Sequence, residues 1–180
     1  MDKKEKIIVA LISTSINERG GRCRHFANLY KYLSPEFKIV IFICSKVEDK
    51  IREFMLQNGV LEEDLVFLSR RNKLLIIPFI LEIRNQLLKR KVIIVHTFDL
   101  QSDIFGGLAA RFAGIKKIYA LFESKAIPEN ISFIKSIFYK VINMFIKDIF
   151  VNSVVVTEGL RKEVVLHKYR KAEKVKLIRI

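Results

Sequence analysis

The sequence has few of the residues that build metal centres or disulfide frameworks: two cysteines, three histidines and no tryptophan in 180 residues. Cys23 and Cys44 are not part of a Cys/His spacing typical of a zinc site, so we expect no bound metal. A reduced chain in the cytoplasm is the simplest explanation for so few cysteines. Neither a metal nor a disulfide is therefore expected to organise the fold.

Long hydrophobic runs are also missing. The longest unbroken apolar run extends from Leu74 to Leu81, contains Pro78, and is far shorter than the roughly 20 residues of a membrane-spanning helix. The lysine-rich N-terminus and the run from Ile7 to Ile12 superficially resemble a signal peptide. However, this run is short, and polar residues stand in place of a small-residue cleavage site. We therefore expect a first strand here, and no segment that crosses a membrane.

Acidic residues are scarce relative to basic ones. There are 19 Asp and Glu against 33 Lys and Arg, which gives a net charge of +14. This charge favours anionic partners, namely nucleic acid, anionic lipid or phosphorylated small molecules, and its sign does not choose among them. Most phenylalanines lie inside apolar runs, where burial explains them better than base stacking does. Nucleic acid is therefore the disfavoured partner.

Apolar runs alternate with amphipathic segments along the chain, and 51% of the residues are hydrophobic. Continuous apolar runs are typical of parallel strands that are covered on both faces. Strands are expected at Ile7 to Ile12, Phe37 to Cys44, Leu65 to Leu68, Val92 to Val95, Lys117 to Phe122, Ile149 to Val156 and Val175 to Ile180. Helices are expected from the glycine pair to Leu33, at Lys46 to Gln57, from a first turn with Pro78 to Lys89, and at Ile104 to Ala113, Ile131 to Lys147 and Glu158 to Tyr169. The pattern predicts one α/β domain over residues 1–180, a doubly wound, Rossmann-like parallel sheet of about seven strands with helices on both faces.

Two glycine pairs have different meanings. Gly20 and Gly21 stand between the first strand and the first helix, where exposed backbone N–H groups and the positive end of the helix dipole make a candidate anion cradle. The alternative is a tight turn that needs glycine only for its backbone angles. Gly106 and Gly107 lie inside a helical pattern, so they indicate close packing of helix on sheet rather than phosphate binding.

Ligands of such sheets bind at the carboxyl ends of the strands, near the reversal of strand order. The loops of interest are therefore Ser13 to Gly21, His96 to Asp103, Phe122 to Pro128 and Thr157 to Glu158. At the end of its predicted strand, His96 is either a packed, hydrogen-bonded residue or a ligand contact. The acidic residues of these loops form no catalytic pair, and we expect solvated charges at Asp99, Asp103 and Glu123.

Three stretches form a pattern when they are taken in order. Gly20 to Leu33 joins a glycine pair to a helix, Val92 to Asp99 ends a strand in valine-histidine before the helix at Gly107 to Gly114, and Val154 to Arg161 joins a strand to a Thr-Glu helix start. Together they resemble the N-terminal domain of the family 4-like retaining glycosyltransferases, which have a two-domain GT-B architecture. The resemblance covers nearly the whole chain, and it implies sugar transfer from a nucleotide-sugar donor.

The resemblance also implies roles for particular residues. Gly20, Gly21 and Arg22 would face the donor diphosphate and stabilise charge on the leaving group. His96 would be the candidate catalytic residue. The acceptor and sugar side of the cleft would be formed by Asp99, Phe122, Glu123, Thr157 and Glu158. Neither a metal nor a cofactor is implied, because the nucleotide sugar is a substrate.

The sequence departs from the family at two side chains and in length. Phe98 and Phe122 stand where many members have histidine. The sequence ends at Ile180, where members continue into a Pro-Asn-Gly segment and a C-terminal domain that holds most of the nucleotide contacts. We therefore expect an acceptor-side half that acts on a membrane-associated or cell-surface glycan precursor, with a partner chain that carries the donor-binding domain. The alternatives are a truncated or degenerate remnant, such as a non-catalytic basic module that binds anionic membrane or nucleic acid.

The segment from Ile131 to Lys147 has an apolar face wider than a surface helix requires. One hypothesis is that it lies in the interface of an anionic bilayer on the cytoplasmic side, with membrane-facing residues Phe138, Lys140, Phe145 and Lys147. The other hypothesis is that the face packs on the sheet or against the absent domain. A second basic cluster, which we expect to be a solvated face, consists of Arg161, Lys162, His167, Lys168, Arg170, Lys171 and Lys174.

Overall fold

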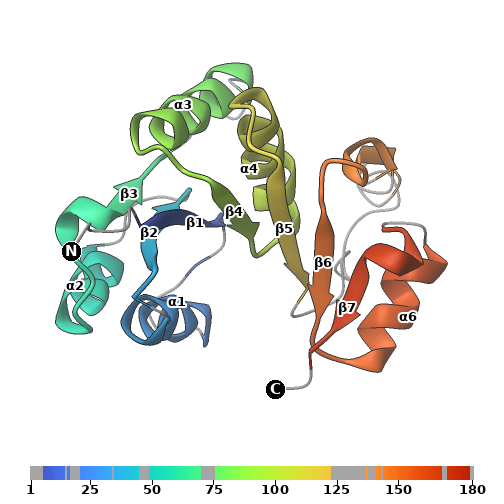
Figure 1. The fold of residues 1–180 in the computed structure, drawn as a ribbon, viewed down its shortest axis with the longest axis horizontal. Helices are drawn as coiled ribbons and strands as arrows, with labels where there is room; N and C mark the ends of the chain where they lie inside the picture. The colour runs from blue at the N-terminus through green and yellow to red at the C-terminus, as the bar shows by residue number, and fades with distance from the viewer. Residues whose placement is uncertain are drawn as a thin grey trace.

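The chain forms a parallel sheet with helices on both faces, as a computed structural model shows (Figure 1). The structure describes residues 6–14, 16, 21–33, 35–44, 49–69, 76–122, 137, 141–142, 144–167 and 170–178. Within these ranges the sheet has seven strands in the order β3-β2-β1-β4-β5-β6-β7, and every neighbouring pair is parallel. The predicted α/β class and Rossmann-like sheet are therefore confirmed.

Most elements form where the apolar patterns predicted them. The strands are β1 (Ile7–Ser13), β2 (Phe37–Ile43), β3 (Leu65–Phe67), β4 (Ile94–Thr97), β5 (Lys117–Phe122), β6 (Asn152–Val155) and β7 (Val175–Leu177). The helices are α1 (Gly21–Tyr32), α2 (Asp49–Gln57), α3 (Ile76–Lys89), α4 (Leu100–Phe112) and α6 (Glu158–Leu166), with short 3-10 turns η1 (Glu62–Asp64) and η2 (Ala172–Lys174). Pro78 lies in the first turn of α3, where its missing N–H costs no helical hydrogen bond.

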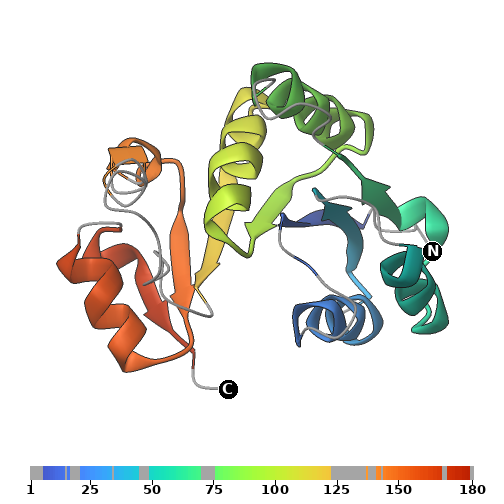
Figure 2. The same ribbon diagram turned by 180° about the vertical axis from the view of Figure 1, so that it is seen from behind.

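Two apolar cores lie on opposite faces of the sheet. Alternate residues of one strand serve the two cores, because successive side chains of a strand point to opposite faces. In β1, Val9 and Leu11 pack in the core that includes residues of α1 and α2, whereas Ala10 and Ile12 pack in the core that includes residues of α3, α4 and α6. Figures 1 and 2 show α3 and α4 on one side of the sheet and α1 and α2 on the other. Both faces are thus covered, which explains the continuous apolar runs.

The two cysteines lie in different cores. Cys23 packs in the core that includes residues of α1, and Cys44 packs in the core on the other face of the sheet. Cys23 and Cys44 are free thiols and are buried. Burial raises the pKa of Cys23 to about 11 and raises the pKa of Cys44 further, so both thiols stay protonated at neutral pH. Among the described residues, no helix is both long enough and apolar enough to cross a bilayer.

The predicted position of the fourth strand is wrong by two residues. The structure has β4 at Ile94–Thr97 rather than at Val92 to Val95, because His96 and Thr97 pair with Leu11 and Ile12 of β1. His96 and Thr97 therefore belong to the strand, and the loop predicted from His96 to Asp103 shrinks to Phe98 and Asp99.

The glycine pair of α4 lies against rigid neighbours. A Cβ atom at Gly106 would lie 3.1 and 3.2 Å from Ile12 side-chain atoms and 3.3 Å from Thr97 Cγ2. At Gly107 it would lie 3.1 Å from Phe150 Cζ. The predicted close approach of helix and sheet is confirmed, and it brings the middle of α4 close to the ends of β1 and β4.

We predict that Gly106→Ala destabilises the protein by about 1–3 kcal/mol, although alanine favours helix, because the β-branched side chains of Ile12 and Thr97 have little freedom to move. The matched control is Gly159→Ala in α6, where the new Cβ meets only Thr157 Oγ1 at 3.9 Å. This control should be neutral or stabilising by up to about 1 kcal/mol. Chemical denaturation measures both, and a Gly106→Ala variant as stable as the wild type would contradict the packing argument.

Candidate functional site

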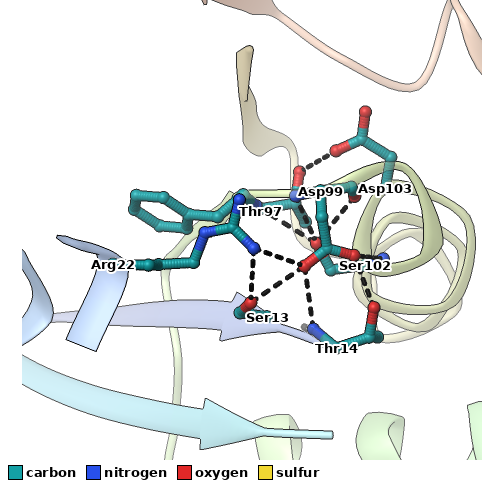
Figure 3. A network of polar contacts seen from close by, with 8 residues as sticks. Ser13, Thr14, Arg22, Thr97, Asp99, Ser102 and Asp103 are labelled. Carbon is teal, nitrogen blue, oxygen red and sulfur yellow. Dashed lines mark hydrogen bonds and ion pairs between the residues drawn. The ribbon is translucent and has the colours of Figure 1, made fainter. Parts of the chain in front are cut away.

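The strand order reverses at β1. The chain adds β2 and β3 on one side of β1 and then returns to add β4 on the other. In sheets of this kind, the ligand-binding crevice lies outside the carboxyl ends of the two strands that flank the reversal. The candidate site is therefore formed by the residues that follow β1 and β4, together with the first turn of α1, which contacts them (Figure 3).

One carboxylate joins these elements. Asp99 Oδ2 accepts hydrogen bonds from Ser13 Oγ and from the Thr14 backbone N–H, both at 2.8 Å. Asp99 Oδ1 accepts from Thr14 Oγ1 and, at 2.9 Å, from the Ser102 backbone N–H. The last contact caps α4, and the Ser102 hydroxyl accepts in return from the Asp99 N–H at 3.0 Å, which completes a capping box. Asp99 thus connects the end of β1 to the start of α4. The prediction of a solvated charge at Asp99 is therefore wrong.

Arg22 approaches the same carboxylate from the first turn of α1. Its Nη1 atom lies 3.5 Å from Asp99 Oδ2 and donates to Ser13 Oγ at 3.3 Å. Gly21, the first residue of α1, is exposed, and a Cβ atom there would meet no atom of the described residues within 4 Å. Open space therefore lies beside the α1 N-terminus, as an approaching anion would require. The other residue of the pair, Gly20, lies outside the described residues.

A second, fully buried network begins one helical turn further along α4. Asp103 Oδ2 lies 3.0 Å from Arg170 Nη2, and Asp103 Oδ1 accepts from Thr97 Oγ1. Arg170 Nε also donates to Ser153 Oγ at 3.1 Å. Asp103 and Arg170 are each only 2% exposed, so the predictions of a solvated Asp103 and of a solvated face at Arg170 are wrong. Burial raises the pKa of Asp103 to about 6, although Arg170 and Thr97 act to lower it.

Phe122 contacts this second network. The Arg170 guanidinium lies 4.2 Å from the Phe150 ring centroid and 5.3 Å from that of Phe122. Both rings are buried, so they stabilise the cation by its interaction with their π faces. Phe122, the last residue of β5, therefore packs near the Arg170 guanidinium.

His96 carries an unpaired nitrogen. Its Nε2 atom is buried and has no hydrogen-bond partner among the described residues. Its ring lies 4.4 Å from that of Phe98, which also packs against His25 and Phe26 of α1 at 5.7 and 4.5 Å. Burial, together with the charge of His25, lowers the pKa of His96 to about 4, so the imidazole is neutral at pH 7. A neutral imidazole with a free nitrogen is suited to bind a hydroxyl group.

The other predicted site residues lie away from Asp99 in the contacts that the structure describes. Thr157 caps α6 by accepting from the Leu160 N–H at 3.2 Å, and Glu158 pairs with Arg161 at 3.3 Å, both at the surface. Phe145 is 82% exposed, and Lys147 is partly buried. Glu123, Phe138 and Lys140 lie outside the described residues. Within the described ranges, no group of three or more His, Cys, Asp or Glu residues could hold a metal ion.

Sequence reasoning missed the partners of both aspartates. The spacing Asp99-x-x-Ser102 before an apolar stretch is a signal for a helix start that could have identified Asp99 as a cap. No comparable signal marks Arg170, which stands in a cluster of basic residues of which Arg161, Lys162, His167 and Lys171 are exposed. Its burial depends on the long-range contact with Asp103, 67 residues earlier.

Comparison with known proteins gives no match by sequence: no protein-family model and no curated protein matches the chain. Solved structures do match in fold. The lipopolysaccharide outer core galactosyltransferase WaaB in its apo form has a TM-score of 0.64 at 13% identity, over 96% of this chain and 45% of WaaB. Anabaena Alr3699/HepE in complex with UDP and glucose has a TM-score of 0.70 at 9% identity, over 95% of this chain and 44% of that one.

The same fold also occurs in a different class of enzyme. The UDP-GlcNAc 2-epimerase from Neisseria meningitidis bound to UDP-GlcNAc has a TM-score of 0.63 at 9% identity, over 94% of this chain and 45% of the epimerase. The chain thus spans less than half the length of the solved structures it matches. At these identities the matches establish the fold, which is that of one GT-B-type domain.

We predict that His96→Leu and His96→Gln weaken the dependence of the free energy of unfolding on pH between pH 4 and pH 6.5. Because the pKa of His96 is about 4 in the folded chain against 6.5 as its ordinary value, the unfolded state binds more protons between these pH values. The free energy of unfolding should therefore fall by up to about 3 kcal/mol from this group as pH decreases from 6.5 to 4.

Denaturant titrations at pH 7 and pH 4 measure this difference. The raised pKa of Asp103 acts in the opposite sense, since ionisation of Asp103 costs stability as pH increases towards 6. This contribution is common to the wild type and both variants, so it cancels in the comparison. A pH dependence as steep in the two variants as in the wild type would show that His96 is not the group responsible.

Proposed function

We propose that this chain is the acceptor-side half of a nucleotide-sugar-dependent glycosyltransferase, with a separate chain that supplies the donor-binding half. The observation that supports this most strongly is the extent of the fold match: 94–96% of the chain against 44–45% of the three proteins compared. Two of these three are named with a nucleotide or nucleotide sugar bound. The three ordered motifs, which contain Gly21, His96 and Thr157, further support the proposal that the transferase is of the family 4-like, retaining kind.

The donor diphosphate would lie at the N-terminus of α1, against Gly20, Gly21 and Arg22. The backbone N–H groups of a first helical turn have no intrahelical partner, so they can stabilise negative charge on the leaving nucleotide. Arg22 would add little charge of its own, because it already faces Asp99. This half alone would therefore bind a diphosphate weakly, which agrees with a second domain that holds most of the nucleotide contacts.

The acceptor would lie on the side of β4 and β5. His96 is the candidate catalytic residue, because its neutral ring has a buried Nε2 atom without a partner among the described residues. A hydroxyl group of the acceptor or of the transferred sugar would satisfy that atom. Asp99 would act by holding the end of β4 in place, while Phe122, Glu123, Thr157 and Glu158 would border the cleft.

The test is to find the partner and to assay the complex. We predict that a neighbouring reading frame encodes a Pro-Asn-Gly segment and a Glu-x7-Glu-like segment, and that its product copurifies with this chain. Mass spectrometry with a panel of nucleotide sugars should detect transfer or hydrolysis by the complex and not by the chain alone. His96→Ala in the complex should lower turnover by about 10²-fold or more, without weakening nucleotide binding.

Two outcomes would contradict the proposal. One is saturable, equally tight nucleotide-sugar binding by the isolated chain and by the complex, because this would assign the donor site to the wrong half. The other is a copurifying partner whose complex neither binds nor turns over any nucleotide sugar. That result would favour the second candidate function, a non-catalytic basic module.

We further propose that this half contacts an anionic membrane surface on the cytoplasmic side, where it would meet a membrane-associated acceptor. Ile137, Val141, Met144 and Phe145 have helical spacing and are all exposed. On the other face, Ile142 and Ile146 pack in the core that includes α3 and α4. One side of this segment thus packs on the sheet, and the other side is available to lipid.

Nearby, a hollow of about 350 Å³ is lined by Lys147, Val165, Arg170, Lys171, Ala172 and Glu173.

We predict that Phe145→Asp lowers binding to anionic liposomes by at least about tenfold, because it removes apolar surface that the lipid would bury and adds a charge that anionic lipid repels. Phe112→Asp in α4 is the matched control, since Phe112 is also a well-exposed phenylalanine, at 58%, on a different element. Flotation of each variant with liposomes measures binding, and circular dichroism verifies folding. Equal loss in both variants, or undiminished binding by folded Phe145→Asp, would exclude this segment as the membrane contact.

A further inference from the structure

The donors around Asp99 make up the chemistry of a phosphate site. They are two backbone N–H groups, from Thr14 and Ser102, two hydroxyls, from Ser13 and Thr14, and the Arg22 guanidinium. Figure 3 shows all of them directed at one carboxylate at the reversal of strand order. Backbone N–H groups at a helix start, hydroxyls and arginine are the groups that bind phosphate oxygens in α/β proteins. Here an anion of the chain itself takes all five contacts.

The carboxylate leaves little capacity for a second anion. Both Asp99 oxygens already accept at least two hydrogen bonds each, and the side chain is only 13% exposed. An incoming phosphate at this point would meet a like charge at contact distance, and it would find the surrounding donors already used. Asp99 and Arg22 also form an ion pair, so their two charges offset each other in spite of the +14 of the chain.

We propose that Asp99 is a built-in anion that fills a phosphate-type cradle between β1 and β4 and so excludes phosphate groups from the floor of this crevice. Asp99 is thereby a specificity-determining residue, because it keeps phosphate groups out of the floor. Removal of the carboxylate exposes donors that take inorganic phosphate in its place. This inference concerns the cradle around Asp99 in the isolated chain and not the N–H groups at the start of α1, where the donor diphosphate is proposed to lie, so it is independent of whether the chain completes a transferase.

The test uses Asp99→Ser, because serine caps a helix about as well as aspartate and so preserves the start of α4. Inorganic phosphate is titrated against sodium chloride of equal ionic strength, and the backbone amide signals of Thr14 and Ser102 are followed by NMR. We expect saturable shifts in Asp99→Ser with an affinity at least roughly tenfold higher than in the wild type. Glu53→Gln, at an exposed site on α2, removes the same single charge and should behave like the wild type.

Thermal unfolding provides a second measurement that does not require a fully stable variant. Phosphate that binds only the folded state raises its melting temperature, and the stabilisation grows with the logarithm of one plus the ratio of the phosphate concentration to Kd. Asp99→Ser should therefore regain stability in phosphate and not in chloride, whereas the wild type and Glu53→Gln should respond equally to both salts. The proposal is wrong if the wild type binds phosphate at Thr14 and Ser102 as tightly as the variant does. It is also wrong if Asp99→Ser shows neither saturable shifts nor recovery in phosphate.

Discussion

The carboxylate of Asp99 is the contact on which the crevice depends. Parallel strands leave the backbone at their carboxyl ends without strand partners, and here one side chain satisfies donors from the end of β1, the start of α4 and the first turn of α1. A largely buried charge is stable only when it is paired and hydrogen-bonded, and Asp99 meets both conditions. Because one group supplies all these contacts, the positions of the two loops and of Arg22 are not independent of one another.

Asp103 extends this dependence to the C-terminal part of the described chain. It lies one helical turn after Asp99, with its own N–H bonded to the Asp99 carbonyl at 2.8 Å, and it anchors Arg170 in the interior. The rings of Phe150 and Phe122 enclose the guanidinium, and Ser153 of β6 accepts a further hydrogen bond. Two ion pairs on one helix thus join α1, the reversal of strand order and the segment before β7.

The periodic features of the fold could be predicted from sequence, and the long-range polar contacts could not. Continuous apolar runs predict buried parallel strands because burial acts locally on every residue of the run, which is why β5 is found at its predicted bounds. The glycines of α4 were interpretable because they interrupt a helical pattern. The burial of Arg170 has no local cause, since it requires a carboxylate 67 residues away. His96 was placed beyond its strand because polar residues normally end a buried run, yet its backbone completes the ladder with Leu11.

The spacing of the two aspartates on α4 also limits how this segment can vary in evolution. An α-helix turns by about 100° for each residue, so a single insertion or deletion between Asp99 and Asp103 would rotate the rest of the helix by that angle. Gly106 and Gly107 would no longer face Ile12 and Phe150. Asp103 would also turn away from Arg170, while Asp99 would stay in place. Substitutions here alter one contact at a time, whereas a change of length would break several at once. The segment from β4 to the middle of α4 therefore has a fixed length in any relative that keeps this crevice.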